Sequence, residues 1–212
     1  MARGRAAGYD DQRAAILAEA ARLFARQGYV ATSMNQVADA CGLSKAALYH
    51  YFRDKYALLT HIAEGHVRRL LALVQEVEAE CPDPVGRLPN LITRFVDEYA
   101  SAQDAHRVLT EDVRFLVEQD RERILGVERE VVAHFSQCIA AARPDLGLQA
   151  LDKPLAMLLF GMMNWLFTWF KAGQPLDYPD LAPLVAELFL NGVSGLQARA
   201  STLPSQVPVH AA

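Results

Sequence analysis

The stretch TSMNQVADACGLSKAALYHYF, residues 32–52, contains two short amphipathic segments joined by a glycine. Thr32 or Ser33 is a suitable N-cap for the first segment, because a hydroxyl oxygen accepts a hydrogen bond from a free N–H of the first helical turn. Gly42 is expected to end this segment, since glycine readily adopts the left-handed backbone found at helix C-termini. Ser44 then caps the second segment. The stretch therefore predicts two short helices joined by a tight turn.

The second of these helices carries more polar, cationic and aromatic side chains than its own stability requires. A helix this short is unstable alone, so one of its faces must pack on neighbouring helices. The apolar residues that can supply this face are Leu43, Leu48 and Phe52. The side chains left to face outward are Ser44, Lys45, Ala46, Tyr49 and His50. This division is typical of the recognition helix of a helix-turn-helix unit, which lies in the major groove of DNA.

Helical periodicity continues along the rest of the chain, and no alternating strand pattern occurs. An apolar stripe over residues 10–27 predicts a helix that Gly28 ends. A long helix is expected from Asp54 to about Glu80, before a pair of prolines. Later helices are expected at about 87–102, 104–118, 120–142, 152–172 and 180–199. The predicted fold class is all-α, with about nine helices.

The charge of the chain is unevenly distributed. The net charge of -4 combines a basic N-terminal quarter, in which residues 1–55 hold eight Lys or Arg and five Asp or Glu, with an acidic remainder. Only the first quarter is therefore suited to a polyanion. The three cysteines form no C-x-x-C pair, which fits a reducing cytoplasm. The most apolar run, residues 155–170, is shorter than the roughly 20 residues that cross a bilayer, so no membrane contact is expected.

Residues 16–59 resemble the N-terminal domain of the TetR/AcrR family of bacterial transcriptional regulators. The resemblance rests on the LFA...GY...TS start, the VA..CG.SK..LYHYF middle and the K..LL end of this stretch. It implies a helix-turn-helix DNA-binding domain over 10–55, with the motif itself at about 33–52. It also implies a larger helical effector-binding and dimerisation domain over 56–200.

The two ends of the chain are short polar segments rich in small residues. Segments of this composition do not bury enough apolar surface to order themselves. Residues 1–9 are therefore expected to form a disordered basic arm, and residues 201–212 a disordered tail. By the resemblance, Arg3 and Arg5 of the arm would lie in an adjacent minor groove.

The resemblance implies DNA contacts by Ser33, Ser44, Lys45, Ala46, Tyr49, His50 and Lys55. Ser33 begins a helix, where free N–H groups and a partial positive charge favour a phosphate. Lys45 can reach a base edge or a phosphate, and Ala46 can touch a thymine methyl group. The expected partner is a pseudo-palindromic double-stranded operator, bound by a homodimer. The last two helices resemble the dimerising pair of the family.

The resemblance also implies a small-molecule effector that fills the second domain and shifts the long fourth helix. The candidate lining residues are Phe95, Tyr99, Phe115, His134, Cys138, Asn164, Trp165, Thr168 and Trp169. Asn164 and Thr168 are four residues apart and share a helix face, as do the two tryptophans. The N-W-x-x-x-W run resembles members that respond to acyl-CoA or aromatic-acid thioesters. The alternative, that these residues belong to the core or to a dimer interface, remains open.

No catalytic signature accompanies these features. The sequence lacks H-E-x-x-H, G-x-S-x-G and a phosphate-cradling loop, so neither an enzyme nor a bound metal or cofactor is expected. The alternative is a helical protein that binds a small molecule or a partner and has lost its operator. Lys45, Tyr49 and Lys55 are retained, which favours the regulator. The predicted function is that of a ligand-responsive transcriptional repressor.

Overall fold

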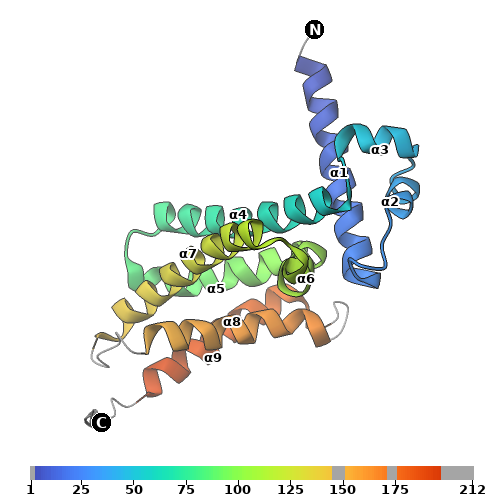
Figure 1. Cartoon of the computed structure of the whole chain (residues 1–212). Helices are drawn as coiled ribbons and strands as arrows, with labels where there is room; N and C mark the ends of the chain where they lie inside the picture. The colour runs from blue at the N-terminus through green and yellow to red at the C-terminus, as the bar shows by residue number, and fades with distance from the viewer. Residues whose placement is uncertain (1–2, 145–150, 171–175, 197–212) are drawn as a thin grey trace, which may run out of the picture.

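The computed structural model describes residues 3–144, 151–170 and 176–196. Within these ranges the chain forms nine α-helices and one short 3₁₀ turn, with no strand (Figure 1). The all-α prediction is confirmed. The predicted tail over 201–212 lies outside the described residues.

Three helices form the N-terminal unit, namely α1 (Arg3–Gln27), α2 (Met34–Ala40) and α3 (Lys45–Tyr51). Ser33 is the N-cap of α2: its Oγ accepts a hydrogen bond from Gln36 N at 3.3 Å, and Gln36 Oε1 accepts one from Ser33 N at 2.8 Å. Ser44 caps α3 in the same manner, with 3.2 Å between its Oγ and Ala47 N. Gly42 has φ +64°, the left-handed conformation expected of it. The turn between α2 and α3 thus follows directly from local sequence.

Helix α1 begins at Arg3 and not near Asp10, so residues 3–9 are helical. For residues 3–9 this corrects the prediction of a disordered arm over 1–9, whose first two residues lie outside the described part of the chain. Alanine and arginine are strong helix formers, and they let the helix extend toward the N-terminus. The extension also packs, because the Tyr9 ring stacks on the Tyr51 ring of α3 with 4.8 Å between centroids.

The remaining helices form a larger bundle, and their bounds are α4 (Lys55–Glu80), α5 (Pro84–Ser101), α6 (Gln103–Asp112), α7 (Glu118–Ala142), α8 (Asp152–Trp169) and α9 (Tyr178–Gly195). The predicted helix over 104–118 is broken by a 3₁₀ turn, η1 (Val113–Phe115). Helix α5 starts earlier than predicted, because the Asp83 carboxylate accepts hydrogen bonds from two N–H groups of its first turn.

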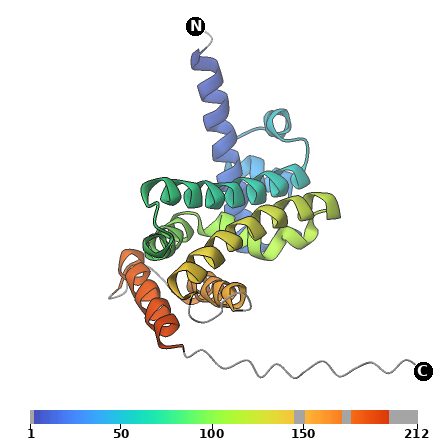
Figure 2. The same cartoon turned by 90° about the vertical axis from the view of Figure 1, so that its left-hand side faces the viewer.

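Two hydrophobic cores share helix α4. Leu58 and Leu59 of its first half belong to the core of the N-terminal unit, which also takes in Val108 of α6 and Ile124 of α7. The second half of α4 joins α5, α7, α8 and α9 in the other core. Figures 1 and 2 show α4 running from beside the middle of α1 across the larger bundle. A displacement of α4 would therefore change the packing of both cores.

Candidate DNA-binding surface and ligand cavity

Helix α3 presents two distinct faces. Leu48 and Phe52 are buried in the core of the N-terminal unit, as predicted from their spacing. The opposite face is exposed and carries Ser44, Lys45, Ala46, Tyr49 and His50. Ser33, at the start of α2, is also exposed. The side chains predicted to contact DNA on α3 therefore share one solvent-facing surface.

Lys45 and Tyr49 lie one turn apart on this surface. The Lys45 Nζ atom is 6.0 Å from the centroid of the Tyr49 ring. A cation at this distance from an aromatic face is weakly attracted to it. The two groups can consequently approach a phosphate or a base edge together.

Lys55 has a role that the sequence did not predict. Its Nζ donates hydrogen bonds to the backbone oxygens of Tyr29, Val30 and Thr32, at 2.8, 3.1 and 2.7 Å. The same ammonium lies 4.5 Å from the centroid of the Tyr29 ring, and burial lowers the pKa of Lys55. An ammonium has three N–H donors, so none is left for DNA. The predicted phosphate contact is thus replaced by a structural role, in which Lys55 fixes the loop between α1 and α2.

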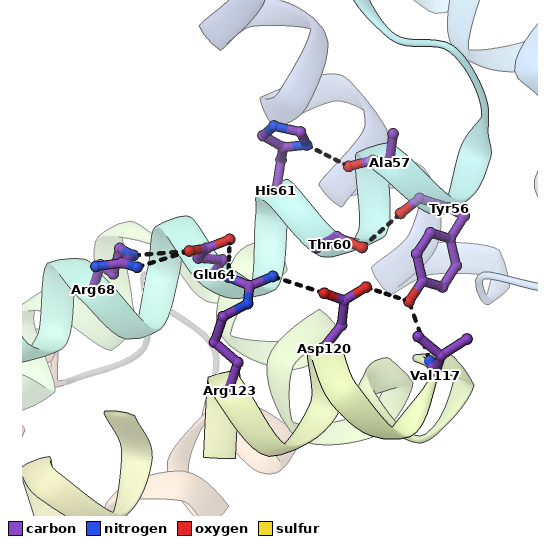
Figure 3. A network of polar contacts seen from close by, with 9 residues as sticks. All are labelled: Tyr56, Ala57, Thr60, His61, Glu64, Arg68, Val117, Asp120 and Arg123. Atoms are coloured by element: carbon purple, nitrogen blue, oxygen red, sulfur yellow. Dashed lines mark hydrogen bonds and ion pairs between the residues drawn. The ribbon is translucent and has the colours of Figure 1, made fainter. Parts of the chain in front are cut away.

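A polar network ties the start of α4 to the start of α7 (Figure 3). Tyr56 donates its hydroxyl proton to Asp120 Oδ2 at 2.7 Å and accepts a hydrogen bond from Val117 N at 3.1 Å. Arg123 bridges Asp120 and Glu64 through ion pairs. The hydrogen bond from Tyr56 lowers the pKa of Asp120, and the bond from Arg123 lowers that of Glu64. The part of α4 nearest the DNA-binding unit is therefore held against α7.

A cavity of about 640 Å³ lies between helices α4 to α8. Its walls are largely apolar and include Val67, Leu70, Leu109, Val131, Met157 and Phe160. Five uncharged polar side chains also line it: Tyr99, His106, Ser136, Gln137 and Asn164. The charged lining residues are Glu128, Arg129, Asp152 and Lys153. A mostly apolar cavity of this size with a few polar groups is typical of a small-molecule site.

Two buried histidines connect this cavity to α4. His66 Nε2 of α4 lies 3.1 Å from His106 Nδ1 of α6, and the His106 ring stacks on Tyr99 with 3.7 Å between centroids. Burial lowers the pKa of His66 to about 4. Burial and the neighbouring His66 lower the pKa of His106 to about 3, against a smaller opposing effect of Asn164. Both rings are therefore uncharged at neutral pH, and the proton of one ring forms the bond between them.

Of the residues predicted to bind an effector, Tyr99 and Asn164 line the cavity. Phe95 and Cys138 are buried in the core of the larger bundle. Phe95 meets the Tyr99 ring edge-on at 5.9 Å, so it supports the cavity wall without forming it.

The other predicted effector residues lie elsewhere. His134 Nδ1 is 3.1 Å from Glu78 Oε1, between α7 and α4. Phe115 packs beside Tyr29, near the DNA-binding unit. Trp165 and Trp169 are 65% and 56% exposed, and the Thr168 hydroxyl beside them donates to Trp165 O at 2.7 Å. For the two tryptophans, helical spacing shows that they share a face but not which neighbour that face meets.

Several residues that line the cavity were not predicted from the sequence, although helical spacing on α8 could have identified some of them. Lys153, Met157, Phe160 and Asn164 follow one another at helical spacing on α8 and form one wall. The face of Asn164 therefore continues toward the start of α8, not toward Thr168. His106 and Ser136 come from other helices, and no local pattern marks them.

Two kinds of feature are absent from the described parts of the chain. No helix there is long and apolar enough to span a membrane. Within the same residues, no group of three or more His, Cys, Asp or Glu side chains is arranged to hold a metal ion.

Comparison with known proteins agrees with this architecture. The family model for bacterial regulatory proteins of the tetR family matches residues 16–62, and the model for a tetracyclin repressor-like C-terminal domain matches residues 81–193. The chain belongs to the TetR family. The resemblance found in residues 16–59 is confirmed, and the TetR match extends over the larger bundle as well.

Individual TetR-family relatives match over most of the chain. A regulator from Bordetella parapertussis 12822 has 35% sequence identity and a TM-score of 0.80, covering 88% of this chain and 98% of its own. The transcriptional repressor KstR2 from Rhodococcus jostii (strain RHA1) is 25% identical over 190 residues, which are 88% of this chain and 93% of the relative. AibR, solved with isovaleryl coenzyme A and operator DNA, shares the fold with a TM-score of 0.73 at 24% identity, over 84% of this chain and 97% of its own. The chain is accordingly a DNA-binding transcriptional regulator of this family.

Proposed function

We propose that this chain is a homodimeric, cytoplasmic repressor that leaves a pseudo-palindromic operator when an acyl-CoA or aromatic-acid thioester fills the cavity between α4 and α8. The observation that carries the proposal is the position of α4. This helix contributes Val67 and Leu70 to the cavity wall and Leu58 and Leu59 to the core beneath the recognition helix. A ligand in the cavity would therefore contact the same helix that packs against the DNA-binding unit.

The DNA-binding half of the proposal rests on the exposed face of α3. Ser44, Lys45, Tyr49 and His50 stand on this face, while Leu48 anchors the helix from behind. A helix held in this way can enter the major groove. Lys55 is not counted among the contacts, because its ammonium is bound within the protein.

The dimer rests on an apolar face of the last two helices. The exposed large apolar residues there are Leu158, Trp165 and Trp169 of α8, and Leu184 and Leu188 of α9. A cluster of this kind is costly to leave in water and marks an association surface. A dimer that binds two operator half-sites needs its two recognition helices about 34 to 36 Å apart, one turn of DNA.

Release from DNA follows if the ligand favours a position of α4 that the operator does not accept. A ligand with equal affinity for both positions would shift nothing. The cavity volume of about 640 Å³ suits the acyl or aryl part of a thioester. Arg129 and Lys153 supply cations for the phosphates of coenzyme A, and both side chains are exposed.

The proposal is tested with DNA from upstream of the gene in a mobility-shift assay. Lys45→Ala and Tyr49→Ala are each expected to weaken binding at least tenfold with an unchanged circular dichroism spectrum. Arg107→Ala is the matched control, because it removes an exposed cation of α6 that pairs with Glu111, far along the chain from α3. Binding should also weaken steeply as salt rises, through counterion release.

Release is tested in the same assay with isovaleryl coenzyme A as the probe thioester. We expect a lower operator affinity at saturating thioester and no effect of free coenzyme A. A salt-independent shift, or variants of α3 that bind as tightly as the wild type, would contradict the DNA-binding half of the proposal. An operator complex that survives a saturating panel of acyl and aryl thioesters would contradict the ligand class.

A further inference from the structure

Two residues of α1 pack against the C-terminal end of α3. The Tyr9 ring stacks on the Tyr51 ring, with 4.8 Å between centroids and 25° between the ring planes. The Arg13 Cζ atom lies 5.0 Å from the centroid of the Phe52 ring, and Phe52 is the C-cap of α3. Tyr9 and Arg13 are four residues apart, so they share one face of α1. One face of α1 therefore holds two consecutive residues at the end of α3.

The buried anchors of α3 leave its rotation incompletely fixed. Leu48 is the buried residue of this seven-residue helix, and the next anchor is Phe52. Each residue turns a helix by about 100°, so these two side chains project only about 40° apart and do not by themselves resist rocking of α3. Measured from Leu48, Tyr51 projects about 60° to one side. Lys45 and Tyr49 project about 60° and about 100° to the other side, so the ring stacked on Tyr51 holds the flank of α3 that these DNA-facing residues leave free.

The same stack reaches the DNA-facing surface through His50. The Tyr9 ring meets the His50 ring edge-on, with 6.3 Å between centroids, and His50 meets the Tyr51 ring edge-on at 5.8 Å. His50 is exposed on the face that carries the predicted DNA contacts. A hydrogen bond to DNA requires its donor and acceptor atoms to lie within about 3.2 Å. A small rotation of α3 would therefore break such bonds, and the three packed rings oppose that rotation.

We propose that Tyr9 is a positioning residue for operator binding, which sets the rotation of α3 by stacking on Tyr51 and contacts no DNA itself. The inference rests on the DNA-binding half of the proposed function and adds to it a residue outside α2 and α3. It also assigns a role to the N-terminal extension of α1, because Tyr9 lies before Asp10, in the stretch that apolar periodicity did not predict to be helical.

The operator affinity of the full-length protein is measured by mobility shift with the upstream DNA. Tyr9→Ala should weaken binding at least fivefold, because α3 loses the ring that opposes its rotation. Tyr9→Phe should bind within twofold of the wild type, since a phenyl ring keeps the stack and lacks only the hydroxyl. An unchanged affinity in Tyr9→Ala would overturn the proposal. An equal loss in Tyr9→Phe would also overturn it, by showing that the Tyr9 hydroxyl contacts DNA.

A double-mutant cycle assigns the effect to the stack. Tyr51→Ala should also weaken operator binding. The variant with both Tyr9→Ala and Tyr51→Ala should bind within twofold of the weaker single variant, because the two changes remove one interaction. Losses that multiply in the double variant would show that the two rings act separately, and the proposal would be wrong.

Phe115→Ala is the matched control for the loss of an exposed ring. The Phe115 ring is 37% exposed against 39% for Tyr9, and it packs beside Tyr29 in the loop between α1 and α2. The operator affinity of this variant should stay within twofold of the wild type. A loss equal to that of Tyr9→Ala would reduce the effect to a general loosening of the N-terminal unit and would contradict a specific role of Tyr9.

Hydrogen exchange of the free protein tests the positioning role without DNA. Leu48 N donates to Ser44 O and Phe52 N donates to Leu48 O, each at 3.0 Å, and local opening of α3 exposes these amides to exchange. Their exchange should be at least threefold faster in Tyr9→Ala than in the wild type and unchanged in Phe115→Ala. Equal rates in all three proteins would contradict the proposal. Far-UV circular dichroism checks the fold, and Tyr9→Leu, which also lacks the ring, gives the same comparison if Tyr9→Ala unfolds.

These measurements separate the inference from the proposed function. If Lys45→Ala and Tyr49→Ala weaken operator binding while Tyr9→Ala does not, the DNA-binding surface stands and the positioning role is wrong. If exchange in α3 is faster in Tyr9→Ala but the wild type binds no upstream DNA, the support of α3 by Tyr9 stands and the repressor function is wrong.

Discussion

Replacing both His66 and His106 with residues that do not titrate should remove much of the acid sensitivity of this protein. The two rings form a buried pair, with 3.1 Å between His66 Nε2 and His106 Nδ1. Their pKa values in the folded chain are about 4 and about 3, below the ordinary value of about 6.5. The unfolded chain therefore binds two protons, between pH 6.5 and pH 4, that the folded chain does not. Their contribution to stability is complete above pH 6.5 and is lost as the pH falls.

The size of this loss follows from the linkage between proton binding and folding. At pH 5 each ring is almost fully protonated in the unfolded chain and neutral in the folded chain. Each ring therefore lowers the free energy of unfolding by about 2 kcal/mol between pH 7.5 and pH 5. The two rings together cost about 4 kcal/mol, a large share of the roughly 5 to 15 kcal/mol that stabilises a typical domain. Because both folded pKa values lie below 5, this figure depends little on their precise size.

The variant of choice is His66→Leu with His106→Phe. It replaces both partners of one hydrogen bond with apolar groups, which is close to neutral in stability, and it keeps an aromatic ring against Tyr99. Free energies of unfolding are measured by urea titration at pH 7.5 and pH 5, at one protein concentration because a dimer's stability depends on it. The wild type should lose about 4 kcal/mol more than the variant between these pH values. Other titrating groups are common to both proteins and cancel.

A single-site control uses His61, an exposed histidine of α4. His61→Gln, measured in the same way, shows how much of the pH dependence changes when a histidine outside the buried pair is removed. If the double variant and the wild type lose stability equally between pH 7.5 and pH 5, the two rings are not neutral in the folded protein, and the description of the pair given above is wrong.

Three further substitutions probe other parts of the structure. Tyr56→Phe removes the hydroxyl that bonds both Val117 N–H and Asp120, and it should lower the free energy of unfolding by about 1 to 3 kcal/mol in urea titration. An unchanged value would show that the network does not contribute to stability. Lys55→Met leaves three backbone oxygens without their donor, so it should lower the melting temperature. The slope of log binding constant against log salt concentration should stay unchanged, and a slope reduced by about one would reveal a phosphate contact. Leu188 is 68% exposed on the apolar face of α9, and Leu188→Glu places a charge there. It should convert the proposed dimer to monomers in sedimentation velocity, and a dimer that persists would place the interface elsewhere.

The residues around α2 and α3 show why this part of the fold could be predicted. Ser33 and Ser44 cap their helices through bonds to residues three positions later, and Gly42 takes a left-handed conformation that depends only on its own lack of a side chain. These are local interactions. The spacing of Leu48 and Phe52 then fixes which side of α3 is buried and which is left for DNA.

The contacts that were not predicted join residues distant in the chain. Lys55 bonds to oxygens 23 to 26 positions earlier, and His66 meets His106 40 positions away. Such pairs exist only after the helices have packed, and many residues of each helix could have occupied either place. The same reason applies to Trp165 and Trp169 of α8, because the helical period grouped the two residues correctly but could not show that the pair faces outward.

The sequence by itself determined that the chain is helical, that its N-terminal unit carries a recognition helix, and which side chains that helix exposes, because caps, glycines and apolar spacing act over a few residues. Only the tertiary structure decided that Lys55 braces a loop, that α4 is shared by two cores, and that Ser136 and Asn164 meet at one cavity. The physical reason is that the cavity wall is assembled from the faces of five helices. The periodicity of each helix shows which residues share a face but does not predict which helices pack together.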